Sequence, residues 1–153
     1  MKPPRRNDGI DPAARSRARR RALQALYAWQ MSSSPVEKVI EQFRAEQDME
    51  IADLEYFEAL VRGVVAHADE LDAVLVQFLD RTMAQVDPIE RAVLRIAGFE
   101  LAHRLDVPYR VVINEAIETT KRFGAEQGHT YVNGVLDRAA AEWRAQEIAA
   151  ARR

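Results

Sequence analysis

The 153-residue chain contains no cysteine. It can therefore form no disulfide, thiolate nucleophile or zinc–thiolate site, which suits a reducing compartment such as the cytoplasm. No apolar run approaches the roughly 20 residues that cross a bilayer, and the basic N-terminus is not followed by the apolar stretch of a signal peptide. We therefore expect a cytoplasmic protein that does not span a membrane.

The sequence also has few groups that could converge as a catalytic site. Its three histidines share no metal-ligand spacing. Gly124 and Gly128 lack the Lys-Ser/Thr partner of a phosphate-binding loop. Glu115 and Glu118 lie three apart, but no Glu-x-x-His motif on another segment matches them as in a di-iron protein. We therefore expect no enzymatic activity, no metal site and no cofactor.

Glycine and proline are scarce, at six each, and most of the chain has helical periodicity with no strand-like alternation. Asp11-Pro12, Ser34-Pro35 and Asp87-Pro88 have the form of a capping residue followed by a first-turn proline. A bend is expected at Arg62-Gly63 or His67. Helices are predicted over residues 12–31, 35–46, 50–80 (one bent helix or two abutting ones), 88–105, 108–123 and 130–143.

These patterns predict an all-α fold of six or seven short-looped helices. A chain of this length with 48% apolar residues can bury one core of ordinary size. We expect a flexible basic arm over 1–11, one helical domain over 12–145 and a frayed tail over 146–153. Gly124 should cap a helix C-terminus, and Gly134 should permit a close helix crossing because glycine within a helix is otherwise unfavourable.

Positive charge is concentrated at one end of the chain. The first 21 residues carry eight Lys/Arg and two Asp, although the net charge of the whole chain is −2. Such clustering favours binding to a polyanion. Arg17, Arg20, Gln24 and Tyr27 share one side of the first predicted helix, where they could contact phosphates and stack on bases. Equally, Leu23 and Tyr27 could pack beneath another helix and leave the arginines as a solvated face.

A second basic and aromatic patch follows the Gly-bounded turn near residue 124. Tyr131 and Arg138 lie seven residues apart on the flank of the last predicted helix, and Lys121 and Arg122 end the helix before it. They could form a second contact patch beside the arm. The residues alone favour the alternative, in which they are ordinary helix-end and surface side chains.

Several segments together resemble the NusB family of transcription antitermination factors, in order over residues 13–143. They are the Arg-rich arm with Ala25-Leu-Tyr-Ala-Trp-Gln30, Arg91-Ala-Val-Leu-Arg-Ile-Ala97, Asp106-Val-Pro108, Val112-Ile-Asn-Glu-Ala-Ile-Glu118, Lys121-Arg-Phe-Gly124 and Tyr131-Val-Asn-Gly-Val-Leu136. Ser16 interrupts a run that is often more basic in the family. Tyr131 stands where phenylalanine is expected, which keeps a stacking ring and adds a hydroxyl.

The resemblance implies two small helical bundles and no catalysis. It implies binding to boxA RNA of nascent ribosomal transcripts together with the small-subunit ribosomal protein NusE, and assembly with other Nus factors and RNA polymerase. It leaves open whether the chain is a monomer or a homodimer. By position, it assigns RNA contact to Arg15, Arg17, Arg19, Arg20, Tyr27, Lys121, Phe123, Gln127 and Tyr131, and NusE contact to Arg81, Glu90, Arg91 and Leu94.

Two other functions compete with this one. Ribosomal RNA methyltransferases of one family carry a NusB-like domain, but this chain has no Rossmann-like unit or cofactor loop. The other alternative is a helical adaptor with a merely solvated basic tail, whose RNA binding would ignore sequence and disappear at physiological salt.

Overall fold

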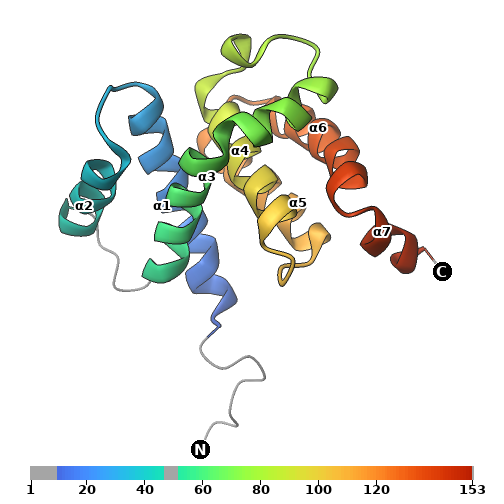
Figure 1. Ribbon diagram of the computed structural model, residues 1–153, viewed down its shortest axis with the longest axis horizontal. Helices are drawn as coiled ribbons and strands as arrows, with labels where there is room; N and C mark the ends of the chain where they lie inside the picture. The colour runs from blue at the N-terminus through green and yellow to red at the C-terminus, as the bar shows by residue number, and fades with distance from the viewer. Residues whose placement is uncertain (1–9, 47–51, 153) are drawn as a thin grey trace, which may run out of the picture.

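The computed structural model describes residues 10–46 and 52–152, and within these ranges it contains helices and turns but no strand. The all-α prediction is therefore confirmed. Residues 1–9 of the predicted basic arm lie outside the described residues. The elements are α1 (Pro12–Gln30), α2 (Val36–Glu46), α3 (Leu54–Leu75), the short 3-10 turns η1 (Val76–Phe78) and η2 (Met83–Gln85), α4 (Pro88–His103), α5 (Tyr109–Phe123), α6 (Gly128–Trp143) and α7 (Ala145–Ala151) (Figure 1).

Two helices begin as the sequence predicts. The carboxylate of Asp11 accepts a hydrogen bond from the Ala13 N–H at 3.0 Å, and that of Asp87 accepts one from the Ile89 N–H at 2.9 Å. In each case a proline occupies the first helical position, where its missing N–H is not needed. Both caps satisfy amides that have no partner within the helix.

The helices form two groups that share one core. α1, α2 and α3 lie on one side, α4, α5 and α6 lie on the other, and α3 packs along α4 between them (Figure 1). The largest fully buried apolar side chains come from both groups: Leu23, Leu26, Ile40, Phe57, Leu60, Leu71, Leu75, Leu94, Leu101 and Leu136. No described helix is both long enough and apolar enough to cross a membrane.

Glycine and histidine shape the contact between α3 and α4. α3 bends at His67, whose φ of −112° and ψ of 15° are not helical, as predicted. A Cβ at Gly63 would lie 2.2 Å from a ring atom of Phe99, so the absence of a side chain permits this approach. Gly134, by contrast, has open space where a Cβ would stand. The prediction of a close helix crossing at Gly134 is wrong.

The C-terminal segment forms α7 rather than a frayed tail. The buried Arg144 guanidinium, at the start of α7, donates hydrogen bonds to the backbone carbonyls of Leu101 at 2.7 Å, Glu100 at 3.1 Å and Arg104 at 3.0 Å. These carbonyls lie at the end of α4, where the Glu100 carbonyl also accepts a hydrogen bond from the Arg104 N–H at 2.9 Å and the Arg104 carbonyl accepts one from the Val107 N–H at 3.0 Å. The side chain thus ties the last helix to the core, which composition alone did not indicate.

Candidate nucleic-acid interface

The exposed side of α1 carries a row of basic and polar side chains next to the end of α5. Ala18, Ala22 and Ala25 are fully buried on the opposite side of α1, which fixes the rotation of the helix. A surface hollow of about 250 Å³, called the cationic hollow below, is lined by Arg17, Arg20, Arg21, Gln24, Ala52, Arg122 and Phe123. The two basic segments predicted from the sequence therefore meet in space.

Arg21 is a member of this hollow that the helical-face argument missed. The argument selected side chains in line with Arg17 and Arg20, whereas Arg21 lies about 100° around the helix from Arg20. The unbroken run from Arg19 to Arg21 was the available signal. Tyr27, one turn beyond Gln24, is 38% exposed, whereas Leu23 is buried. The alternative is therefore correct for Leu23 but not for Tyr27, which remains partly accessible.

Like charges crowd the cationic hollow. The pKa of Arg20 is lowered, first by partial burial and then by the positive charges of Arg122, Arg17 and Arg21, against which Glu115 acts in the opposite direction. An anion bound among these guanidinium groups would relieve such repulsion. A phosphate group has the charge and acceptor oxygens to satisfy several guanidinium groups at once.

A second, more polar hollow of about 480 Å³ adjoins the first. Arg20 and Arg122 line both hollows, and Lys121 lines the second. The Lys121 ammonium lies 3.7 Å from the Glu118 carboxylate in an exposed ion pair, which contributes little to stability. Lys121 can therefore exchange this partner for a phosphate with little loss.

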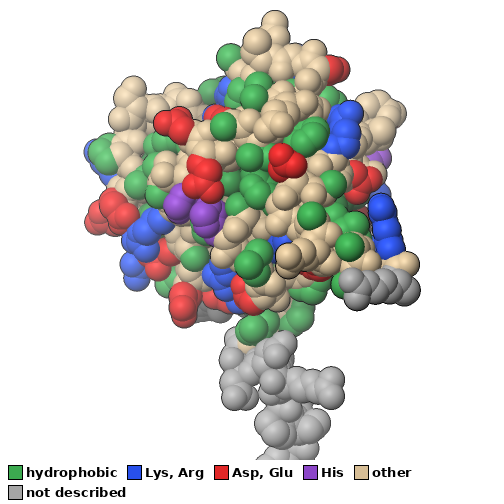
Figure 2. Space-filling model, turned by 45° about the vertical axis from the view of Figure 1, so that its right-hand side comes forward, with side chains coloured by type: hydrophobic (Ala, Val, Ile, Leu, Met, Phe, Trp, Pro, Cys, Tyr) green, Lys and Arg blue, Asp and Glu red, His purple; other side chains and the backbone are tan. Residues whose placement is uncertain are grey.

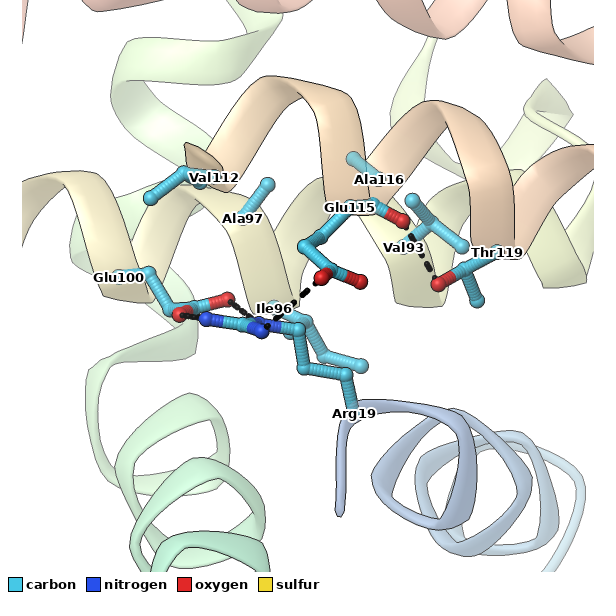
Figure 3. A pocket seen from close by; sticks show the side chains of 9 residues that line it. All are labelled: Arg19, Val93, Ile96, Ala97, Glu100, Val112, Glu115, Ala116 and Thr119. Atoms are coloured by element: carbon cyan, nitrogen blue, oxygen red, sulfur yellow. Dashed lines mark hydrogen bonds and ion pairs between the residues drawn. The ribbon is translucent and has the colours of Figure 1, made fainter. Parts of the chain in front are cut away.

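The structure corrects the predicted role of Arg19. Its guanidinium is buried, donating to Glu100 from Nε at 2.9 Å and from Nη2 at 2.8 Å, and it lies 3.7 Å from Glu115 (Figure 3). Burial acts to lower the pKa of Arg19, but the hydrogen bond and charge of Glu100 outweigh it and raise that pKa. Arg19 thus joins α1 to α4 and α5 and does not belong to the exposed surface.

Arg15 also has partners within the chain. Its guanidinium lies 4.1 Å above the Tyr56 ring centroid, and its side-chain nitrogens lie 3.8 Å from Asp53 and 3.5 Å from Asp106. Two further guanidinium groups, those of Arg19 and Arg104, also lie near this ring. Arg15 is therefore outside the cationic hollow.

The structure places Tyr131 beside Arg81, one of the residues predicted to contact a protein partner. The Arg81 guanidinium lies 4.5 Å from the Tyr131 ring centroid and pairs with Asp80 at 2.6 Å. Partial burial and then the Asp80 charge raise the pKa of Tyr131. Gln127 is exposed immediately before α6. Neither Gln127 nor Tyr131 is among the residues that line the cationic hollow.

Comparison with known proteins assigns the family. The model of the NusB family matches residues 16–141, which run from the second turn of α1 to the last turn of α6. The chain belongs to the NusB family. The transcription antitermination proteins NusB of Xanthomonas campestris pv. campestris (strain B100) and Xanthomonas axonopodis pv. citri (strain 306) are each 66% identical to it over 145 residues, covering 95% of this chain and 91% of the relative.

Solved NusB structures have the same fold. T. maritima NusB superposes with a TM-score of 0.76 at 29% identity, covering 87% of this chain and 95% of that chain. A crystal structure of antitermination factors NusB and NusE in complex with dsRNA matches with a TM-score of 0.77 at 24% identity, covering 84% and 96%. Membership of the NusB family confirms the prediction that the chain is a transcription antitermination factor rather than an enzyme. The predicted cytoplasmic location agrees with this role, because bacterial transcription takes place in the cytoplasm.

The four residues predicted to contact NusE differ in their exposure. Arg81 is exposed, Glu90 is 7% exposed, and Arg91 is half-buried, lining a hollow with Trp29 at the end of α1. Leu94 is fully buried, so the structure corrects its predicted place on a NusB-family interface. Partial burial and the charge of Asp87 raise the pKa of Glu90.

Proposed function

We propose that this chain binds boxA RNA of nascent ribosomal transcripts together with NusE and supports assembly of the antitermination complex on RNA polymerase. The proposed RNA surface consists of Arg17, Arg20, Arg21, Lys121, Arg122 and Phe123, with Tyr27 at one end and Gln127 and Tyr131 as outlying contacts. Arg81 and Arg91 are proposed for the NusE side. Arg19, Glu90 and Leu94 are left out because all three are buried, and Arg15 is left out because it pairs with Asp53 and Asp106 outside the cationic hollow.

The observation that carries the proposal is the convergence of α1 and α5 in one cationic hollow. Arg17, Arg20 and Arg21 come from α1, whereas Arg122 comes from α5, about a hundred residues later in the chain. Phe123 and the exposed Tyr27 add rings beside them. Guanidinium groups with accessible rings match a flexible single strand, whose phosphates and unpaired bases are both available.

A salt titration tests the RNA surface. If the four arginines of the cationic hollow each neutralise one phosphate, the logarithm of affinity should fall against the logarithm of salt concentration with a slope of about −3. Arg20→Ala should weaken binding and flatten the slope by about 0.7. Arg44→Ala is the matched control because Arg44 is an exposed arginine on α2 that pairs with Glu58. Equal slopes for both variants and the unaltered chain would remove Arg20 from the site.

A second titration tests the partner and the sequence preference. A boxA RNA and a scrambled RNA of the same length are compared at physiological salt, each with and without NusE. We expect NusE to tighten binding to boxA RNA and to leave the scrambled RNA largely unaffected, since phosphate contacts position a strand and base contacts specify it. Equal, weak binding to both RNAs with no effect of NusE would instead support the helical adaptor with a solvated basic surface.

A further inference from the structure

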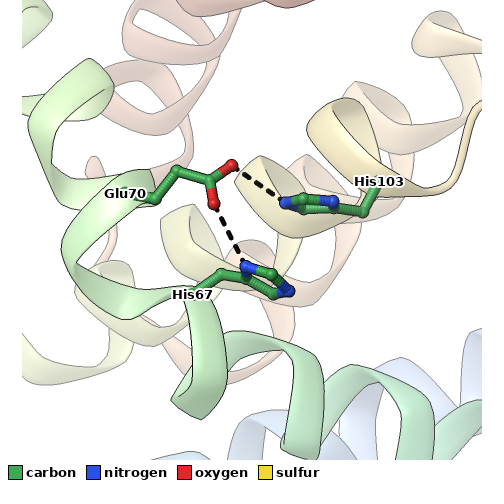
Figure 4. Close-up of side chains that lie close together, drawn as sticks. All are labelled: His67, Glu70 and His103. Carbon is green, nitrogen blue, oxygen red and sulfur yellow. Dashed lines mark hydrogen bonds and ion pairs between the residues drawn. The ribbon is translucent and has the colours of Figure 1, made fainter.

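His67, Glu70 and His103 converge where α3 bends and α4 ends (Figure 4). His67 Nδ1 lies 3.1 Å from one carboxylate oxygen of Glu70, and His103 Nε2 lies 3.0 Å from the other. The donor atoms of the three side chains all lie within 4.8 Å of one another. None of the three lines the cationic hollow, so their arrangement needs a separate explanation.

The donor set suits a divalent transition-metal ion. Imidazole nitrogen and carboxylate oxygen are ligands that Zn²⁺ binds at about 2.0–2.2 Å, which places two ligands of a tetrahedral ion about 3.4 Å apart. The present nitrogen–oxygen separations of 3.0 and 3.1 Å are only a few tenths of an ångström shorter. The two histidines contact different oxygens of the Glu70 carboxylate, so an ion would bind once side-chain rotation brings the two nitrogens, which lie within 4.8 Å of each other, to this ligand spacing.

The two imidazole rings are held in place by their surroundings. Their centroids lie 4.1 Å apart at an interplanar angle of 27°, and Phe99 lies 5.4 Å from His103 and 6.1 Å from His67. Phe99 in turn packs against Gly63, where a Cβ would clash with it. The stack turns one nitrogen of each histidine toward Glu70 (Figure 4), so the three donor side chains already face one another.

The cluster is open to solvent, as the binding of an ion requires. The three side chains are 31–52% exposed. Histidines lie beside acidic side chains on the surface seen in Figure 2. An ion can therefore enter and keep water in its remaining positions.

We propose that His67, Glu70 and His103 bind one divalent transition-metal ion, for which Zn²⁺ is the probe. His67 is the residue at which α3 bends, Glu70 lies three residues beyond the bend, and His103 belongs to the last turn of α4. A bound ion would therefore fasten the bend of α3 to the end of α4.

The test is a Zn²⁺ titration of the full, tag-free chain, by calorimetry or by competition with a chromophoric chelator. His103→Phe removes a donor but retains a ring for the stack, and Glu70→Gln removes the anionic ligand. His129→Ala is the matched control because His129, on α6, is outside the cluster. We expect one Zn²⁺ per chain, at least about tenfold weaker binding in the first two variants, and no change in the control.

Thermal unfolding provides a second measurement that does not depend on RNA binding. Zn²⁺ should raise the midpoint of the unaltered chain and of His129→Ala, because an ion bound only to the folded state stabilises it, but not that of His103→Phe. Circular dichroism before titration checks that each variant is folded. The proposal is overturned if the unaltered chain binds no Zn²⁺, or if His103→Phe binds as well as His129→Ala.

Discussion

Substitution of two neighbouring arginines on α1 should affect different properties. A change at Arg19 should lower the stability of the fold, whereas a change at Arg20 should lower RNA affinity. The Arg19 side chain is 6% exposed and its partner Glu100 is 1% exposed. The Tyr56 hydroxyl donates a hydrogen bond to the same carboxylate, and burial and then the charge of Glu100 raise the pKa of Tyr56. Arg19→Met would keep apolar packing but leave Glu100 buried without its counterion.

The expected loss follows from the isolated charge. Removing one partner of a buried ion pair costs about 3–5 kcal/mol, and in a chain of this size each 1 kcal/mol lowers the unfolding midpoint by about 2–4 °C. Arg19→Met should therefore unfold roughly 6–20 °C below the unaltered chain. Arg19→Met/Glu100→Leu should recover much of that loss, since it replaces both charges with apolar groups.

Urea and thermal unfolding followed by far-ultraviolet circular dichroism measure these differences. Arg20→Met is the control, and its free energy of unfolding should change by at most about 0.5 kcal/mol because Arg20 lies on the surface among like charges. Its RNA affinity should fall, whereas folded Arg19→Met should retain RNA binding. A loss below about 1 kcal/mol for Arg19→Met, or an equal loss for Arg20→Met, would refute this division of roles.

Three further predictions concern other parts of the molecule. Gly63→Ala should destabilise by about 1–3 kcal/mol because its Cβ would clash with Phe99, whereas Gly134→Ala, with open space around it, should stabilise by up to about 1 kcal/mol in urea unfolding. Glu90→Gln should raise the free energy of unfolding at pH 7, because the raised folded-state pKa makes the ionised form unfavourable there. Its advantage should vanish below the ordinary carboxyl pKa of 4.5; a constant difference from pH 4 to 8 would contradict this. Tyr27→Ala should weaken RNA binding by about 1–3 kcal/mol with unchanged helix content, and a loss of folding would count against a stacking role.

Helical periodicity and capping predicted most of the fold because both depend on local physics. Asp11-Pro12 and Asp87-Pro88 mark helix starts through contacts within four residues. The bend at His67 and the cap at Gly124 were also predicted correctly. Gly134 was misjudged because a glycine in a helix indicates room for a neighbour but does not show that one is there.

The site was only partly predictable because exposure depends on distant partners. Arg19 and Arg20 are indistinguishable as residue types, and Glu100 and Glu115, which hold Arg19 in the core, lie more than eighty residues away in the chain. The cluster of His67 and His103 escaped spacing rules for the same reason, since the packing of α3 on α4 brings these rings together.

The hydrogen bonds of Arg144 have a consequence for the order of folding during synthesis. The carbonyls of Glu100, Leu101 and Arg104 accept hydrogen bonds from a side chain that the ribosome adds some forty residues later. Until then these carbonyls lack the guanidinium donor, whereas α1, α2 and α3 have already been made. The first bundle can therefore assemble early, and the second is completed only when Arg144 emerges.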